Sequence, residues 1–297
     1  MTAIGLVCLS LSLAQVGPER PRFSSTVHSV YLDVTVTGPN QVFLPELGVD
    51  DFEVLEDGVR QEISFFASDE TAPVSLVLLL DASTSIAGSE RAIRRAAGDL
   101  VREMGLSDQA AVVVFSDEIL TSTHFTSLHD PLLDAVGSLY PRGSTALNDA
   151  IAHALDKLSR VEGRRALLVF TDGSDSRPME GGSKASGADI LELARRSEAT
   201  VYTVGFIAEG RGVNRKFLTA LADETGGRAF FPVNAEHLSR SFKAVEQELH
   251  TRYRIAFTPR NGVLDGGWRR VEVRIPAQPA LVVRTRQGYY AEAARDP

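Results

Sequence analysis

The spacing of apolar residues divides the chain into three parts. In residues 26–70, apolar and polar positions alternate in short runs, the period-two pattern of strands with one buried face. In residues 74–249, continuous apolar runs alternate with stretches in which apolar residues recur every three or four positions, which predicts buried parallel strands and helices. The period-two pattern returns in residues 251–291. This order predicts an α/β unit between two β segments.

The middle part alternates regularly between the two kinds of pattern. The predicted strands are 74–80, 110–115, 166–170, 200–206 and a short one near 229–231. The predicted helices are one from Ser89, as N-cap, to Met104, and others near 132–139, 146–158, 190–197, 217–225 and 237–249. Strands and helices in alternation predict a doubly wound, mostly parallel, Rossmann-like sheet.

The two end segments, 26–70 and 251–291, contain only short strands. Asp57-Gly58 separates the runs 52–55 and 63–66 and predicts a hairpin. A few short strands are marginal by themselves, so neither segment is expected to fold alone. We therefore expect the two segments to form one small β-sandwich, with the α/β domain inserted between them.

Composition narrows the possible partners. The chain has 297 residues, 43% of them hydrophobic and 24% charged, as in ordinary globular proteins. The formal net charge is −8, which provides no attraction for a phosphate backbone and disfavours nucleic acid as a partner. The single cysteine, Cys8, excludes a disulfide framework or a thiolate metal site within one chain.

An apolar run over residues 3–14 lies at the start of the sequence. It is too short to span a bilayer, and small residues, Ser12 and Ala14, precede a segment rich in Gly and Pro. This pattern predicts a signal peptide over residues 1–17 and an exported protein (periplasmic, cell-surface or secreted) that is not membrane-spanning once mature. No basic residue precedes the run, so a buried N-terminal strand or helix is the alternative interpretation.

Five oxygen-bearing side chains fall at predicted strand ends or helix starts. Asp81 and Asp172 each end a buried strand, Ser83 and Ser85 follow Asp81, and Thr145 opens a helix. Ligands of open α/β sheets bind at the carboxyl ends of the strands, so these side chains are expected at one rim. An all-oxygen set suits Mg²⁺, or Mn²⁺. Asp81, Ser83 and Ser85 alone would indicate helix capping more often than a metal site. The prediction therefore depends on Thr145 and Asp172 as well.

The three motifs, DASTS, GST and TDG, resemble the metal-ion-dependent adhesion site of von Willebrand factor type A domains, over about residues 74–249. The resemblance implies that Ser83, Ser85 and Thr145 ligate the metal directly, and that the aspartates do so directly or through water. It implies a non-enzymatic adhesion or assembly module whose metal captures an Asp or Glu of a protein partner. The flanking segments are similar to bacterial von Willebrand-type proteins described from acidobacteria.

A metal-dependent phosphohydrolase of the haloacid-dehalogenase kind is the alternative. Such an enzyme also places an aspartate at the end of its first strand, as Asp81 is placed here. It needs a second acid two residues later, where this chain has Ser83, and a lysine at a later strand end, where the sequence has none. We therefore expect protein binding and no catalytic residues.

Overall fold

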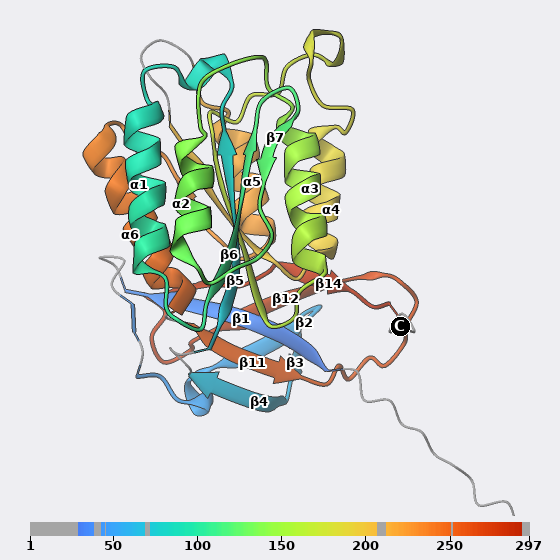
Figure 1. Cartoon of the computed structure of the whole chain (residues 1–297). Helices are drawn as coiled ribbons and strands as arrows, with labels where there is room; N and C mark the ends of the chain where they lie inside the picture. Colours follow the sequence, from blue (N-terminus) through green and yellow to red (C-terminus); the bar gives the residue numbers. More distant parts are fainter. Residues whose placement is uncertain are drawn as a thin grey trace, which may run out of the picture.

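A computed structural model describes residues 29–38, 43–44, 46–68, 72–206, 212–250 and 252–292. An α/β domain stands on a β-sandwich (Figure 1). The predicted signal peptide, 1–17, lies outside the described residues. Within the described ranges, no helix combines the length and apolarity needed to cross a membrane.

The α/β domain is built on a six-stranded sheet with the order β10-β9-β8-β5-β6-β7. Every neighbouring pair is parallel except β6 and β7, which are antiparallel. This confirms the mostly parallel sheet. The strands are β5 (Val74–Asp81), β6 (Gln109–Phe115), β7 (Ile119–Ser122), β8 (Arg164–Thr171), β9 (Thr200–Gly205) and β10 (Ala229–Phe230). The sequence did not predict β7, because this short edge strand is only partly buried and its pattern is weak.

Helices cover both faces of this sheet (Figure 1). Leu76, Leu78 and Leu80 of β5 pack in one core with α1, α2 and α6, whereas Val77 and Leu79 pack in the other with α3, α4 and Leu221 of α5. Burial on both faces explains why β5 is a continuous apolar run. The helices are α1 (Glu90–Glu103), α2 (His129–Gly137), α3 (Leu147–Ser159), α4 (Gly187–Arg196), α5 (Arg215–Glu224) and α6 (Ala235–His250).

The β-sandwich has two antiparallel sheets, with the orders β13-β1-β11-β4 and β14-β12-β2-β3. Each sheet combines strands from both ends of the chain, and they enclose one core that includes Leu32, Val54, Ile255 and Val271. The predicted shared sandwich is therefore the observed fold. Its strands are β1 (Val30–Thr37), β2 (Glu53–Glu56), β3 (Val59–Gln61), β4 (Ile63–Ser68), β11 (Tyr253–Phe257), β12 (Trp268–Arg274), β13 (Val282–Arg284) and β14 (Gly288–Tyr290).

The predicted hairpin exists, but its second strand is different. Asp57 and Gly58 both have positive φ, 49° and 81°, as a two-residue hairpin turn requires. This tight turn pairs β2 with the residues that follow at once, β3, instead of with 63–66. The run 63–66 belongs to β4, which pairs with β11 in the other sheet. The pattern missed β3 because Val59 and Arg60 are exposed.

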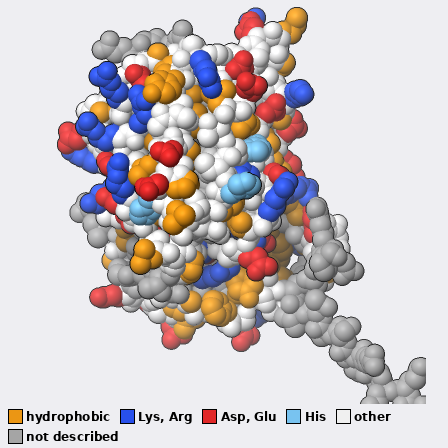
Figure 2. Space-filling model, in the orientation of Figure 1, with side chains coloured by type: hydrophobic (Ala, Val, Ile, Leu, Met, Phe, Trp, Pro, Cys, Tyr) orange, Lys and Arg blue, Asp and Glu red, His pale blue; other side chains and the backbone are white. Residues whose placement is uncertain are grey.

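On the face shown in Figure 2, acidic and basic side chains are interspersed over the helices. The exposed ion pairs of the helices include Asp99 with Arg102 in α1 and Asp156 with Arg160 at the end of α3. Such exposed pairs add little stability.

A buried charge network joins α6 to the sandwich. Glu248 of α6 has an exposed fraction of 0%, and its carboxylate lies 3.2 Å from Nη1 of Arg228 and 2.7 Å from Nη2 of Arg284. Arg252, just after α6, donates from Nε to the Glu248 carbonyl at 2.9 Å and from its guanidinium to the Tyr202 hydroxyl of β9. The network therefore connects the end of α6 to β9 of the six-stranded sheet and to β13 of the sandwich.

Replacing Glu248 by Gln should remove the buried negative charge that faces Arg228 and Arg284. Removal of one partner of a buried ion pair costs about 3–5 kcal/mol, so the free energy of unfolding should fall by that amount. Urea unfolding of Glu248→Gln measures it. The control, Glu236→Gln, alters an exposed pair on the same helix and should change stability by less than about 0.5 kcal/mol. Equal effects of the two substitutions would contradict a structural role for the network.

His250, at the end of α6, forms a pH-sensitive contact with Asp108, which directly precedes β6. Its Nε2 lies 3.3 Å from Oδ2 of Asp108, which also accepts the Gly105 N–H at 2.9 Å, while Oδ1 accepts the Val74 N–H at 2.9 Å. The bond to Asp108 raises the pKa of His250, assisted by Glu246 and opposed by burial and Arg164. Burial opposes ionisation of Asp108, but these hydrogen bonds outweigh it and lower the pKa of Asp108.

These shifts predict a pH dependence of stability. Because the folded state raises the pKa of His250, its contribution is present in full below the unfolded value of about 6.5 and is lost as the pH rises through the folded value. Because the folded state lowers the pKa of Asp108, its contribution to stability is present in full above the unfolded pKa of about 3.9. This contribution is lost as the pH falls through the folded value. Thermal unfolding between pH 6 and 8 should show a loss of stability with rising pH that is smaller in His250→Gln. If stability falls with pH equally in the wild-type protein and in His250→Gln, the contact between His250 and Asp108 does not cause the pH dependence.

Candidate metal centre

Topology brings the two predicted aspartates to one rim. β5 and β8 are adjacent and parallel, with Leu80 in register with Phe170, so Asp81 and Asp172 emerge side by side at the carboxyl ends of the strands. Asp81 ends β5, and Asp172 follows the last residue of β8. This rim lies at the end of the sheet away from the β-sandwich (Figure 1).

The first loop folds back onto Asp81. Its Oδ1 accepts the Ser83 N–H at 2.8 Å, an Asx turn that closes the chain directly after the strand. Its Oδ2 accepts the Thr171 hydroxyl of β8 at 2.7 Å. The hydroxyl oxygens of Ser83 and Ser85 are 2.8 Å apart. The loop thus places two hydroxyls together beside a fixed carboxylate.

The second loop, Gly143–Thr145, is docked on the first. The backbone N–H and the hydroxyl of Thr84 both donate to the Gly143 carbonyl, at 3.2 and 3.1 Å. Gly143 has φ 68°, and a β-carbon there would lie 2.6 Å from Oδ1 of Asp117. The close approach therefore requires glycine. Thr145 is buried, two residues before the start of α3.

The third loop closes the arrangement. The Thr145 N–H donates to the Ser176 hydroxyl at 3.0 Å, and the Ser176 N–H donates to the Thr145 carbonyl at 2.9 Å. Asp172 Oδ1 accepts the Ser174 N–H at 2.9 Å. All five predicted residues thus belong to three loops that are hydrogen-bonded in series. Whether they bind a metal stays a prediction.

Two further aspartates hold the long segment 173–187. Asp175 accepts the N–H of Asn148 at 2.8 Å and the N–H and hydroxyl of Ser183 at 2.9 and 2.7 Å. Asp149 accepts the N–H groups of Lys184 and Ala185, each at 3.0 Å. The sequence pattern did not reveal these roles, because the bonds to Asn148, Lys184 and Ala185 connect residues 27 to 36 positions apart.

The electrostatics of the rim are those of an uncompensated negative site. Asp81 and Asp172 have exposed fractions of 0% and 4%. Burial raises the pKa of Asp81 to about 6, hydrogen bonds from Ser83 and Thr171 lower it, and the charge of Asp172 raises it. None of these groups is cationic, so a bound cation would supply the counter-charge that the neighbouring side chains do not.

The donor set fits a hard divalent cation. Two carboxylates and three hydroxyls are the oxygen ligands that Mg²⁺ and Mn²⁺ take. No cluster of three or more His, Cys, Asp or Glu suited to a metal occurs in the described part of the chain. The predicted centre does not need one, since hydroxyls supply its remaining oxygens.

The sequence matches the von Willebrand factor type A domain over residues 75–244, more than half of the chain. The chain therefore belongs to this family. A search of curated proteins finds no match. The match does not include the flanking segments, so their similarity to the acidobacterial proteins stays a resemblance.

Solved structures share this fold. The von Willebrand factor type A protein from Catenulispora acidiphila has a TM-score of 0.51 and 15% identity, over 84% of this chain and 71% of that one. The von Willebrand domain of the type V pili tip protein Mfa5 from Porphyromonas gingivalis has a TM-score of 0.51 and 12% identity, over 60% of this chain and 95% of that one. Proximal thread matrix protein 1 from the mussel byssus has a TM-score of 0.53 and 19% identity, over 66% of this chain and 51% of that one. At these identities the likeness concerns the fold alone.

Replacing Asp81 by Asn should weaken metal binding strongly with little change in the fold. The substitution removes one of two anionic oxygen donors, so affinity for Mg²⁺ and Mn²⁺ should fall more than about tenfold. Calorimetric titration measures the affinity, and circular dichroism checks the fold. Asp134→Asn, at an exposed position of α2, is the control. Undiminished binding by the Asp81 variant would remove this residue from the site.

Proposed function

We propose that this protein is a non-enzymatic protein-binding module for adhesion or assembly. Its Mg²⁺ or Mn²⁺ ion is held by Asp81, Ser83, Ser85, Thr145 and Asp172, and it accepts an Asp or Glu side chain of a partner protein. The observation that carries this proposal is the interlocking of three loops around two buried carboxylates with no cationic neighbour among the groups that set the pKa of Asp81.

The ligand set is suited to capture of a carboxylate. Mg²⁺ prefers about six oxygen ligands, and two aspartates and three hydroxyls leave the shell incomplete. Hydroxyls contribute no charge, so the ion keeps an attraction for one more anionic oxygen. Ser85 is only partly buried and Thr84 is exposed, which leaves the rim accessible to a partner.

The loop after β8 supplies a firm contact surface beside this rim. The short helix η3 (Pro178–Glu180) carries Met179, whose side chain is fully exposed. A β-carbon on Gly182 would lie 1.7 Å from the Ser176 carbonyl oxygen, so the loop is tightly folded beneath η3. Exposed Met side chains favour adaptable apolar contacts. We infer that the segment 173–187 sets the selectivity for the residues that flank the captured carboxylate.

We further propose that the protein is exported. The apolar run over residues 3–14, followed by small residues and a segment rich in Gly and Pro, supports this. Partners would then be proteins of the cell envelope or of the surroundings.

The proposal is tested by capture of partners from envelope extract of the producing organism. Thr145→Ala removes a hydroxyl ligand, whereas the matched control Thr145→Ser keeps it. Capture should require Mg²⁺, disappear with EDTA and with Thr145→Ala, and persist with Thr145→Ser. Equal capture with Mg²⁺, with EDTA and with both Thr145 variants would show that the metal ion takes no part in partner binding.

The phosphohydrolase alternative is tested separately. Ser83 occupies the position where that chemistry needs a second acid, and its hydroxyl is engaged with Ser85. We expect no hydrolysis of p-nitrophenyl phosphate with Mg²⁺ above the rate of the Asp81→Asn variant. Turnover that is lost in this variant would favour the enzyme.

A further inference from the structure

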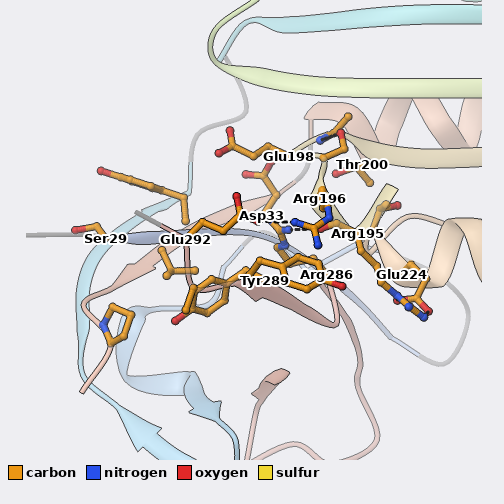
Figure 3. Close-up of a pocket in the computed structure, with 18 of the residues that line it drawn as sticks. Ser29, Asp33, Arg195, Arg196, Glu198, Thr200, Glu224, Arg286, Tyr289 and Glu292 are labelled. Carbon is orange, nitrogen blue, oxygen red and sulfur yellow. Dashed lines mark hydrogen bonds and ion pairs between the residues drawn. The ribbon is translucent and has the colours of Figure 1, made fainter. Parts of the chain in front are cut away.

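A cavity of about 500 Å³ lies between the α/β domain and the β-sandwich, at the end of the six-stranded sheet opposite the metal rim. We call it the interdomain cavity. Glu198 and Thr200 lie on its α/β side, and Tyr289, Arg286 and Glu292 lie on its sandwich side (Figure 3). Its volume falls within the range of about 300–1,000 Å³ typical of small-molecule sites, which often lie between domains.

Most charges that line the interdomain cavity are already paired. Arg195 forms a bidentate pair with Glu224, at 2.9 and 2.7 Å. Arg196 pairs with Glu192 at 3.0 Å and with Glu292. These contacts neutralise one wall of the cavity.

The remaining acidic groups contact other arginines, although Oδ1 of Asp33 is buried without a hydrogen-bond partner in the described part of the chain. Glu198 lies 3.2 Å from Arg165, and Asp33 Oδ2 lies 3.9 Å from Nη1 of Arg252. Neither carboxylate is an ion-pair partner of Arg286 among the described contacts, although both act on its charge from a distance.

Arg286 differs from Arg195 and Arg196, which both pair with carboxylates. Its Nε donates to the Gly288 carbonyl at 2.7 Å and its Nη2 to the Arg195 carbonyl at 2.9 Å, while Nη1 has no hydrogen-bond partner among the described residues. Burial lowers the pKa of Arg286, and the charges of Glu198 and Asp33 only partly oppose this effect. Neutral carbonyls therefore fix the orientation of a desolvated cation for which the described residues provide no ion-pair partner.

The surroundings of Arg286 indicate the kind of anion. Aromatic rings of Tyr31 and Tyr289 line the cavity, and Arg254 lies 5.1 Å above the Tyr31 ring with its Nε buried and unbonded. Rings offer contact area to an apolar or aromatic body. Asp33, Glu198 and Glu292 also line the cavity, and their negative charge disfavours a dianion such as a phosphate monoester.

We propose that the interdomain cavity binds a small organic monocarboxylate, whose carboxylate pairs with Arg286 and whose apolar or aromatic body lies against Tyr31 and Tyr289. This site is separate from the metal centre, and its occupation does not depend on the proposed function. A guanidinium suits a carboxylate because its planar N–H groups donate to the carboxylate oxygens.

Matched probes test the charge requirement on the whole chain. Benzoate, phenylacetate and 3-phenylpropionate are each titrated against their neutral amides, and phenyl phosphate is the dianion. Binding is followed by ligand-observed NMR. EDTA is present throughout, so that no probe binds through a metal at the other rim. At least one carboxylate should bind tenfold or more tightly than its amide, and more tightly than phenyl phosphate. If no carboxylate exceeds its amide, or if phenyl phosphate binds best, the proposal is wrong.

Variants locate the site. Arg286→Gln should weaken binding of the best carboxylate at least tenfold and leave its amide unchanged. Arg196→Gln is the matched control, because that guanidinium lines the same cavity but already pairs with carboxylates, and it should change affinity less than twofold. Arg286 also bonds two backbone carbonyls, so Tyr31→Ala, at a half-exposed ring, provides a second variant that should weaken the carboxylate and its amide alike. Full affinity in both Arg286→Gln and Tyr31→Ala would place binding elsewhere.

Discussion

The pairing of β1 with β11 is the constraint on which the rest of the molecule depends. Residues Val30–Val34 of the first β segment run antiparallel to Tyr253–Phe257 of the last. Because this pairing brings both chain segments to one sheet, the α/β domain must leave and re-enter the sandwich at the same place. β5 starts, and α6 ends, at the sandwich side of the domain. The carboxyl ends of the parallel strands, and therefore the candidate metal rim, must then face away from it.

Much of this arrangement could be predicted from local pattern. Continuous apolar runs predict the parallel strands, spacing of three to four residues predicts the helices, and period-two spacing predicts the sandwich strands, because burial imposes each of these patterns directly. Asp81 and Asp172 were placed at one rim because each ends an apolar run in a parallel sheet. The strands that were missed, β3, β7 and β14, are short and half-exposed, so burial leaves no clear period in them.

The features that sequence reasoning could not reach are set by contacts between distant segments. The bond of Thr171 to Asp81 and the support of the loop 173–187 by Asp149 and Asp175 connect residues far apart in the chain. The interdomain cavity is a stronger case. Arg286 stands in an unremarkable polar stretch, and its isolation from carboxylates follows only from how the sandwich meets the α/β domain.

The way the two domains are joined also determines how the protein would carry a mechanical load. A pull on the metal rim enters the sandwich through β4 and β11, which are paired at Ser68 and Tyr253, the residues nearest to the α/β domain. Both strands are then drawn in the same direction, so the load does not peel one from the other. β1 and β11 lie across the base of the α/β domain instead of continuing its strands (Figure 1), and β11 passes the load to neighbours on both of its sides, β1 and β4. A load shared among paired strands from both ends of the chain makes the sandwich a firm base for a domain that holds a partner.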